Sequence, residues 1–374
     1  MRGQYACRSR AYSRPHIHPL PPQQGKQAGP EKMKKVALLG GSFDPIHQGH
    51  IAMAREALRQ IGADEVWFIP TYQTPLKDRI LTSDTHRTEM IRLAIEGEPR
   101  FRLETIELER KEKSYTIDTL RELKEKYPDI RFYYLIGSDQ MEQFDKWRDV
   151  DELMQLAEFV GIERENTFGS NPCHLRCMNM EQVPVSSSKI RKGDCLQYVD
   201  EKVLDYIYKN RLYVLDFVRS RVHEHRFLHS CSVADLCELF ALENGYDPDK
   251  AYLTGLFHDV AKELDPRQMK AWMKKIAPEY MDAHPAIFHG FVGGQVVRSV
   301  FRLDDPQISN AIHWHVLGLS ADPYAMMVYC ADKLDPTRGY DSSGLIEQCK
   351  KDIYKGFELT KAQNDKYITE KENK

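Results

Sequence analysis

Two histidines lie three positions apart in a stretch that is rich in turn-forming residues. The stretch "GGSFDPIHQGH", residues 40–50, directly follows the apolar run "VALL". Side chains three apart project from the same face of a helix, and the amino end of a helix attracts anions. Glycine permits a tight turn and lets a phosphate approach the backbone amides. We therefore predict a nucleotide-phosphate cradle that consists of Gly40, Gly41, Ser42, Phe43, His47 and His50.

An ordered series of histidines and aspartates runs through the carboxyl-terminal half. Any single member would more often be a helix cap or a satisfied core residue. Together, imidazole and carboxylate ligands without cysteine suit iron, manganese or another transition metal, and Asp259, directly after His258, can bridge two ions that activate water. The predicted ligands are His229, His258, Asp259, His289, His315 and Asp332.

Composition excludes several classes of protein. A chain of 374 residues predicts two or three domains. No apolar run approaches the roughly 20 residues that cross a bilayer, so we expect no membrane partner. The formal charge of −3 offers no basic surplus for a nucleic acid, so we expect no nucleic-acid partner. The eight cysteines are scattered without a CxxC repeat, which fits a reducing compartment and predicts a cytoplasmic protein.

The elements that must position these residues change character along the chain. From Met33 to about Tyr213, β-branched and aromatic runs alternate with helical stretches, which predicts a parallel sheet covered by helices on both faces. The run "FRLETIELE", residues 101–109, is interpreted as one of its strands. From about Asp216 the apolar spacing becomes i, i+3, i+4. The predicted fold is an α/β doubly wound parallel sheet, Rossmann-like, followed by an all-α bundle.

The predicted domain organisation has four segments. The boundary between the two folded parts lies within or just after "EKVLDYIYKNRLYVLDFV", a join without Gly or Pro. The segments are a disordered leader (1–32), an α/β domain (33–214), a helical domain (215–360) and a tail (361–374).

Three further motifs accompany the histidine pair: "VSSSKIR" (185–191), "YLIGSDQMEQFDKW" (134–147) and "SYTIDTL" (114–120). With them, the chain from Met33 to about Tyr213 resembles the HxGH nucleotidyltransferases, and within these the nicotinate-nucleotide adenylyltransferase branch. The resemblance implies transfer of an adenylyl group from ATP to nicotinate mononucleotide, with Mg²⁺ as cofactor.

The resemblance also implies roles for individual residues on the ATP side. Such a transfer needs cationic or proton-donating groups against the charge that builds on pyrophosphate. Ser187 and Ser188 would lie at a helix start that holds the triphosphate. The groups that carry catalysis would be His47, His50, Lys77 and Arg191.

Four other residues would complete the nucleotide and acceptor sites. Gly137 and Asp139 belong to a GxD segment, in which the aspartate suits the ATP ribose or a magnesium-linked water. Thr116 would help to read the carboxylate of the nicotinate ring, and Trp147 offers a flat face for stacking that ring.

Residues from about Asp216 to Lys350 resemble the HD-domain metal phosphohydrolases. They are most similar to the bacterial group that cleaves diadenosine tetraphosphate symmetrically to two ADP. The segment "ADKLDPTR" (331–338) looks like that group's ADKIEPxR. The resemblance implies that Asp259 is catalytic, that Asp332 binds metal, and that Lys333 and Arg338 lie near the substrate phosphates.

The leading hypothesis is a bifunctional enzyme whose ligands are ATP, nicotinate mononucleotide and a dinucleoside polyphosphate, and which can form a homo-oligomer. Two alternatives stay open. The first half could use another acceptor, such as nicotinamide mononucleotide or a phosphopantetheine-like phosphate. The helical half could be a nucleotide-sensing HD module that hydrolyses nothing.

Overall fold

The structure is a computed structural model that describes residues 33–73, 80–164 and 171–372. The predicted leader and Lys77 lie outside the described residues.

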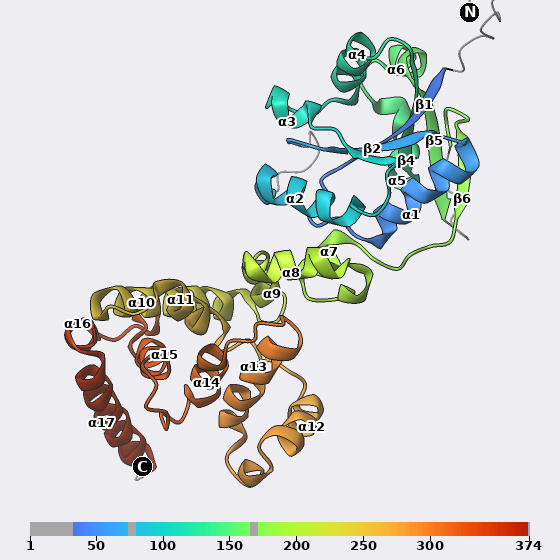
Figure 1. The fold of residues 1–374 in the computed structure, drawn as a ribbon. Helices are drawn as coiled ribbons and strands as arrows, with labels where there is room; N and C mark the ends of the chain where they lie inside the picture. Colours follow the sequence, from blue (N-terminus) through green and yellow to red (C-terminus); the bar gives the residue numbers. More distant parts are fainter. Residues whose placement is uncertain (1–32, 74–79, 165–170, 373–374) are drawn as a thin grey trace, which may run out of the picture. The chain divides into compact units, whose positions relative to one another are not determined.

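Six parallel strands form one sheet in the order β3-β2-β1-β4-β5-β6 (Figure 1). The strand order reverses between β1 and β4, which pair with Leu39 opposite Leu135. In a doubly wound sheet, ligands bind at the carboxyl ends of the strands beside this reversal. The predicted α/β fold is therefore confirmed. The strands are β1 (Lys34–Gly41), β2 (Glu65–Pro70), β3 (Phe101–Leu103), β4 (Ile130–Gly137), β5 (Glu158–Arg164) and β6 (Arg176–Met180).

Helices cover both faces of the sheet. Successive residues of β1 point to opposite faces and are apolar on both, so each face packs against its own set of helices. Ala37 and Leu39 pack in one cluster, while Val36 and Leu38 pack in the other. The first face carries α1 (Gln48–Glu56), α2 (Asp84–Ile95) and α8 (Glu201–Lys209). The second carries α4 (Thr116–Lys126) and α6 (Val150–Leu156). Three short helices complete this half: α3 (Ile106–Arg110), α5 (Ser138–Met141) and α7 (Ser187–Arg191).

Two parts of the sheet differ from the sequence prediction. The run 101–109 is a strand only from Phe101 to Leu103, and α3 follows it. The apolar residues Phe101 and Leu103 alternate, but the next pair, Ile106 and Leu108, falls out of phase with them, which marks the end of the strand. The edge strand β6 was not predicted, because its exposed polar residues carry little of the apolar pattern of the inner strands.

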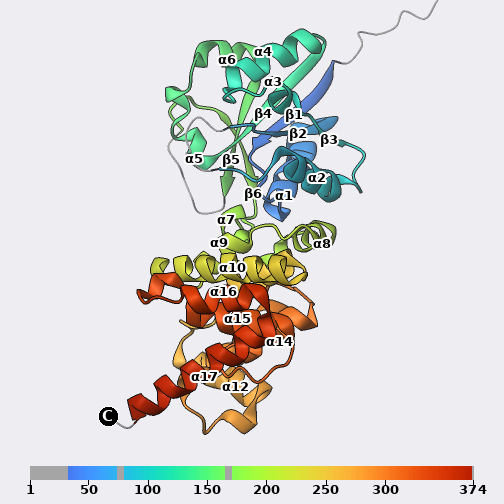
Figure 2. The ribbon, with the colours of Figure 1, turned by 90° about the vertical axis from the view of Figure 1, so that its left-hand side faces the viewer.

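The second half is all helical, as predicted (Figure 2). Four of its helices, α11, α12, α14 and α15, begin at an Asp-Pro pair, in which the aspartate caps the helix and proline is its first residue. The long helix α10 contacts α11, α15 and α16. The helices are α9 (Val214–Arg219), α10 (Glu224–Asn244), α11 (Pro248–Phe257), α12 (Pro266–Ile276), α13 (Phe288–Ser299), α14 (Pro306–Trp314), α15 (Pro323–Leu334), α16 (Ser343–Lys351) and α17 (Ile353–Glu372).

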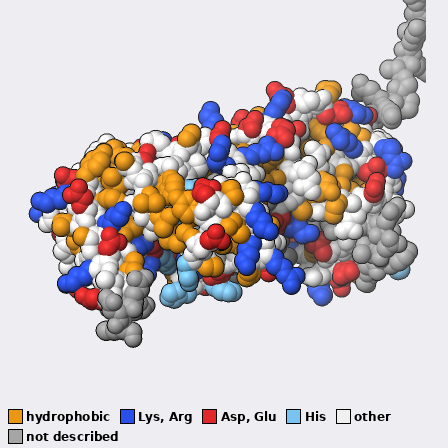
Figure 3. All heavy atoms as spheres, turned by 90° about the horizontal axis from the view of Figure 1, so that it is seen from below, with side chains coloured by type: hydrophobic (Ala, Val, Ile, Leu, Met, Phe, Trp, Pro, Cys, Tyr) orange, Lys and Arg blue, Asp and Glu red, His pale blue; other side chains and the backbone are white. Residues whose placement is uncertain are grey.

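The surface is consistent with the near-neutral composition. On the face shown in Figure 3, basic and acidic side chains are interspersed, and hydrophobic side chains gather over the helical half at the left. Among the described residues, no helix combines the length and the apolar character that crossing a membrane requires. Helix α17 runs without a break past position 361, where the sequence predicted the tail to begin.

Candidate functional sites

The two predicted histidines lie together at the carboxyl end of β1. The rings of His47 and His50 stack with their centroids 3.8 Å apart and their planes 23° from parallel. His47 is the N-cap of α1 and His50 lies in its first turn. The ring of Phe43 meets the ring of His50 edge-on at 4.9 Å and is itself buried. The sequence prediction that both imidazoles face one place is therefore matched by their placement.

One hydrogen bond defines the proton of His50. Its Nδ1 lies 3.2 Å from the backbone nitrogen of His47, whose N–H donates to it. A neutral imidazole that accepts at Nδ1 carries its proton on Nε2. Burial first, and the neighbouring His47 second, hold the pKa of His50 well below its usual range. At neutral pH, His50 is thus an uncharged donor through Nε2.

Side chains anchor the carbonyl oxygens of the loop between β1 and α1. The fully buried Arg87 donates from Nη1 to the Ser42 carbonyl at 2.9 Å. Arg191 donates from Nη1 to the carbonyl of Asp44 at 2.7 Å, and the Ser187 hydroxyl donates to the Pro45 carbonyl at 2.8 Å. In a planar trans peptide the N–H points opposite to the C=O. The amide of Phe43, which shares a peptide unit with the Ser42 carbonyl, therefore points away from Arg87.

Glycines in this loop make room for side chains. A Cβ on Gly40 would collide with the Tyr134 hydroxyl, and one on Gly41 would lie 3.3 Å from the Phe43 ring. A Cβ on Gly49 would lie 3.0 Å from the His47 ring. Gly40 and Gly41 lie outside the left-handed region, whereas Phe43 has a φ of 47°. Steric space, more than conformational freedom, is what these glycines provide.

The predicted acceptor residues lie over the second face of the sheet. Thr116 is the first residue of α4, and its side chain hydrogen-bonds to the buried Tyr134 hydroxyl, whose pKa is raised, mainly by burial. The Trp147 ring is partly buried, 5.3 Å from the Phe144 ring and 6.2 Å from that of Phe159. One aromatic cluster therefore holds Trp147 in place.

The remaining predicted residues of the first half lie on or beside the short helices α5 and α7. Gly137 ends β4 and is the N-cap of α5, on which Asp139 is exposed. Ser187 begins α7, and Ser188 follows it and is exposed. Arg191, at the end of α7, also forms an ion pair of 3.2 Å through Nε with Asp216. The guanidinium that was predicted to hold phosphate thus has protein partners on two sides.

All six predicted metal ligands converge in the helical half. The Asp259 carboxylate lies 3.1 Å from Nε2 of His289, 3.7 Å from that of His258 and 3.9 Å from that of His315. The Asp332 carboxylate lies 3.3 Å from Nε2 of His229 and 3.8 Å from that of His258. Two groups have geometry suited to a metal ion: His229, His258 and Asp332, and His258, Asp259 and His315.

Metal binding needs neutral imidazoles and ionised carboxylates, a need that His258, His315 and Asp259 meet. Burial lowers the pKa of His229, but Asp332 and Asp335 together raise it above its usual value. Burial lowers the pKa of both His258 and His315. Burial pushes the pKa of Asp259 upward, but His258, His289 and Lys262 together hold it well below its usual range. The Nδ1 atoms of His258 and His315 each lie 2.7 Å from a backbone carbonyl, at Gly255 and Ile312, so each donates there and leaves Nε2 unprotonated. Nε2 of His315 lies 3.2 Å from Nε2 of His289.

One buried atom supports the fit of a metal ion most directly. Nε2 of the fully buried His258 has no hydrogen-bond partner among the described residues, although buried polar atoms are nearly always paired. This nitrogen belongs to a residue shared by both ligand groups. The residues present therefore fit divalent ions.

Comparisons with known proteins find separate matches for the α/β half and for the helical half. A cytidylyltransferase-like family model matches residues 38–193 and an HD-domain model matches residues 226–337. The nicotinate-nucleotide adenylyltransferase of Bacillus subtilis is 40% identical over 187 residues, which are 48% of this chain and 99% of that protein. This chain belongs to the nicotinate-nucleotide adenylyltransferase family.

Two further comparisons are with a protein that this chain matches over most of its length and with a solved structure. A Mycoplasma genitalium protein named probable nicotinate-nucleotide adenylyltransferase/Ap4A hydrolase is 29% identical over 87% of this chain and 97% of its own length. A Plasmodium falciparum nicotinic acid mononucleotide adenylyltransferase, solved with NaAD, covers 48% of this chain and 97% of that chain at 25% identity, with a TM-score of 0.43. This member of the adenylyltransferase family carries an HD domain after its α/β part.

Sequence reasoning missed several residues of the two sites. Arg87, from α2, anchors the loop between β1 and α1, and no motif pointed to it. In the HD domain, Arg226 places Nη1 2.5 Å from Asp259, and the fully buried Asp335 lies 2.5 Å from Nδ1 of His229. The signal for Asp335 was its place three residues after Asp332. Lys333 and Arg338, predicted near substrate, both contact Asp332.

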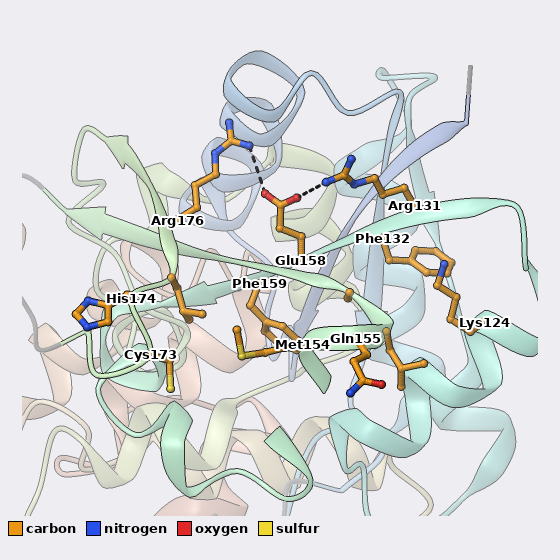
Figure 4. A pocket seen from close by; sticks show the side chains of 13 residues that line it. Lys124, Arg131, Phe132, Met154, Gln155, Glu158, Phe159, Cys173, His174 and Arg176 are labelled. Atoms are coloured by element: carbon orange, nitrogen blue, oxygen red, sulfur yellow. Dashed lines mark hydrogen bonds and ion pairs between the residues drawn. The ribbon is translucent and has the colours of Figure 1, made fainter. Parts of the chain in front are cut away.

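A cavity of about 440 Å³ lies away from both sites. Its lining includes the first residues of β4 and β5, and Figure 4 shows Glu158 between Arg131 and Arg176. The glutamate pairs with these arginines at 2.8 and 3.5 Å. The walls of the cavity include none of the predicted site residues. The cavity lies at the amino ends of the strands, whereas doubly wound sheets bind nucleotides at the carboxyl ends.

Proposed function

We propose that the chain is a bifunctional enzyme. Its first half would transfer the adenylyl group of ATP to nicotinate mononucleotide, giving deamido-NAD and pyrophosphate with Mg²⁺. Its HD domain would hydrolyse diadenosine tetraphosphate to two ADP with two transition-metal ions, iron or manganese by ligand type. The observation that supports the first activity most is the stacked His47–His50 pair at the strand reversal, and for the second it is the convergence on Asp259 and Asp332.

In the transfer reaction, a phosphate oxygen of nicotinate mononucleotide attacks the α-phosphorus of ATP. A new P–O bond forms while the bond to the α–β bridging oxygen breaks, and pyrophosphate leaves with that electron pair. The protein positions the reactants and stabilises the charge on the leaving group. His50 would donate Nε2–H to a phosphate oxygen, and the amide of Phe43 would donate from the anchored loop.

On the acceptor side, Thr116 and Trp147 would select the substrate. A hydroxyl at the amino end of α4 can donate to the carboxylate of nicotinate, and the positive end of the helix favours that negative charge. The Trp147 face would stack on the ring. An amide-bearing ring lacks the charge, so we expect weaker binding of nicotinamide mononucleotide.

In the hydrolysis reaction, a water oxygen forms a bond to a phosphorus beside the central bridge, and the central bridging P–O bond breaks to release the second ADP. The residues that would hold the metal ions are His229, His258, Asp259, His289, His315 and Asp332. Bound there, the ions would supply Lewis acidity and lower the pKa of the attacking water. Lys262, Lys333 and Arg338 lie beside the carboxylates, where they can bind substrate phosphates. The same carboxylates keep these cations oriented.

Paired substitutions in the full chain test whether the two activities use separate sites. His50→Ala should abolish pyrophosphate release and leave hydrolysis intact, whereas Asp259→Ala should do the reverse. Loss of both activities from either substitution would refute two independent sites. The hydrolysis products show which bond of diadenosine tetraphosphate is cleaved. Two ADP are expected, and AMP with ATP would reject symmetrical cleavage.

The acceptor is tested by comparing kcat/KM for nicotinate and nicotinamide mononucleotides. The acid should be preferred, and Trp147→Ala should raise KM for the acceptor more than KM for ATP. Equal or preferred use of the amide would reject nicotinate mononucleotide as the substrate. Cytoplasmic location and a homo-oligomeric state remain predictions, which fractionation and light scattering would check.

A further inference from the structure

The fully buried carboxylate of Asp335 belongs to no predicted ligand set. It lies just after α15, in the turn that leads to Arg338, and is fully shielded from solvent. One oxygen, Oδ2, lies 2.5 Å from Nδ1 of His229 and also accepts from the Thr337 hydroxyl. The other, Oδ1, accepts from the Ser232 hydroxyl at 2.7 Å and from the backbone N–H of Thr337 at 3.0 Å.

These contacts give His229 a partner unlike those of its neighbours. Nδ1 of His258 and of His315 faces a backbone carbonyl, which is neutral. Nδ1 of His229 faces a carboxylate, while Nε2 of the same ring points to Asp332 at 3.3 Å. A carboxylate on the remote nitrogen holds the proton there and makes the other nitrogen a stronger metal ligand.

We propose that Asp335 is a positioning residue of the metal centre, which fixes the His229 proton on Nδ1 so that Nε2 is free to bind metal. The inference rests on the proposed metal-dependent function of the HD domain. It also links two parts of the site, because the turn that Asp335 caps carries Arg338, whose Nη2 lies 2.5 Å from Asp332.

The hydrogen bonds of Asp335 predict what an amide would do in its place. The Thr337 N–H can only donate, so in Asp335→Asn the amide oxygen must take the place of Oδ1. The NH₂ group then takes the place of Oδ2 and donates one hydrogen to Nδ1 of His229 and the other to the Thr337 hydroxyl oxygen, which becomes an acceptor. The neutral ring must carry its proton on Nε2, the nitrogen that a metal needs. The same number of hydrogen bonds forms, so the fold is retained while the tautomer is reversed.

The test measures metal affinity, with Mn²⁺ alone as the probe and calorimetric titration of the full chain as the readout. Asp335→Asn should bind Mn²⁺ roughly 10- to 100-fold more weakly at the His229 group. The melting temperature of its metal-free form should match that of the wild type. The control is Ser232→Ala, which removes one partner of Asp335 but leaves the carboxylate on His229, and should bind Mn²⁺ as the wild type does.

The outcomes distinguish a failure of the Asp335 inference from a failure of the proposed metal centre. Unchanged Mn²⁺ affinity in Asp335→Asn overturns the inference and leaves the metal centre standing, whereas a wild type that binds no Mn²⁺ refutes the proposed metal centre itself. If Asp335→Asn does not fold, NMR of ¹⁵N-histidine in the Zn²⁺-loaded wild type decides. It should show the His229 proton on Nδ1, and Zn²⁺ bound through Nδ1 would overturn the inference.

Discussion

Replacement of Gly49 by alanine should slow adenylyl transfer without touching hydrolysis. Gly49 lies in the first turn of α1, between the two stacked histidines. A Cβ there would lie 3.0 Å from both Cε1 and Nδ1 of His47 and 3.3 Å from a methyl of Val185. Ordinary contacts begin at 3.4 Å, so the His47 ring must move by about 0.4 Å.

The expected loss follows from that displacement. A misplacement of about 1 Å at a catalytic group can cost roughly 100-fold in rate. If the logarithm of the rate scales with distance, 0.4 Å corresponds to about sixfold, or about 1 kcal/mol in the activation free energy. The unfolding free energy should change little, because alanine favours the helix by about 0.5–1 kcal/mol while crowding opposes it.

Steady-state pyrophosphate release at saturating ATP and nicotinate mononucleotide measures the effect, and hydrolysis by the same preparation is the internal control. Gly97→Ala is the matched variant, since a Cβ on Gly97 would meet no atom within 4 Å. It should leave kcat unchanged. A Gly49→Ala enzyme with wild-type kcat would refute the claim that the spacing of the His47 and His50 rings matters.

Three further outcomes are expected. Arg87→Met leaves the carbonyls of Ser42 and Thr82 without their buried donor, so urea denaturation should show a loss of roughly 2–5 kcal/mol, and transfer should fall with it. Because the pKa of His50 lies below that of an unfolded histidine, the unfolded state binds more protons below about pH 6.5. Stability should therefore fall as pH drops through that range, and a His50→Gln variant whose stability falls as steeply would contradict this. Removing transition metals with a chelator and restoring Mg²⁺ should return pyrophosphate release but not ADP formation; persistent hydrolysis would argue against the metal centre.

Periodicity predicted the inner elements because burial repeats at fixed spacing there. In β1, alternate residues enter two cores, and the run of apolar residues shows that both faces are covered. The prediction was wrong for residues 104–109, because one local run was interpreted without its change of phase at Ile106. It missed β6, an edge strand with exposed polar residues that lacks the pattern of its neighbours. Elements whose form depends on long-range pairing leave the weakest local signal.

For the two sites, the order of residues in the sequence predicted which side chains lie close together, but not which other residues anchor them. The spacing of His47 and His50 within one helical turn is local, so their stacking could be expected. The partners that anchor or orient site residues come from elsewhere: Arg87 from α2 to the loop after β1, and Asp335 across 106 positions to His229. Such distant pairings follow no fixed spacing, so a local signal such as the place of Asp335 beside Asp332 does not reveal that its partner is His229.

In the proposed function, histidine has opposite tasks in the two halves, because Nδ1 of His50 and Nδ1 of His258 meet opposite backbone partners. Nδ1 of His50 accepts from the backbone N–H of His47, which places the proton on Nε2 and makes that nitrogen a donor for a phosphate oxygen. Nδ1 of His258 lies on the Gly255 carbonyl, which leaves Nε2 bare and makes it a ligand for a cation. An imidazole can therefore address a polyanion directly or through a metal ion, and one backbone group, an N–H or a C=O, decides which.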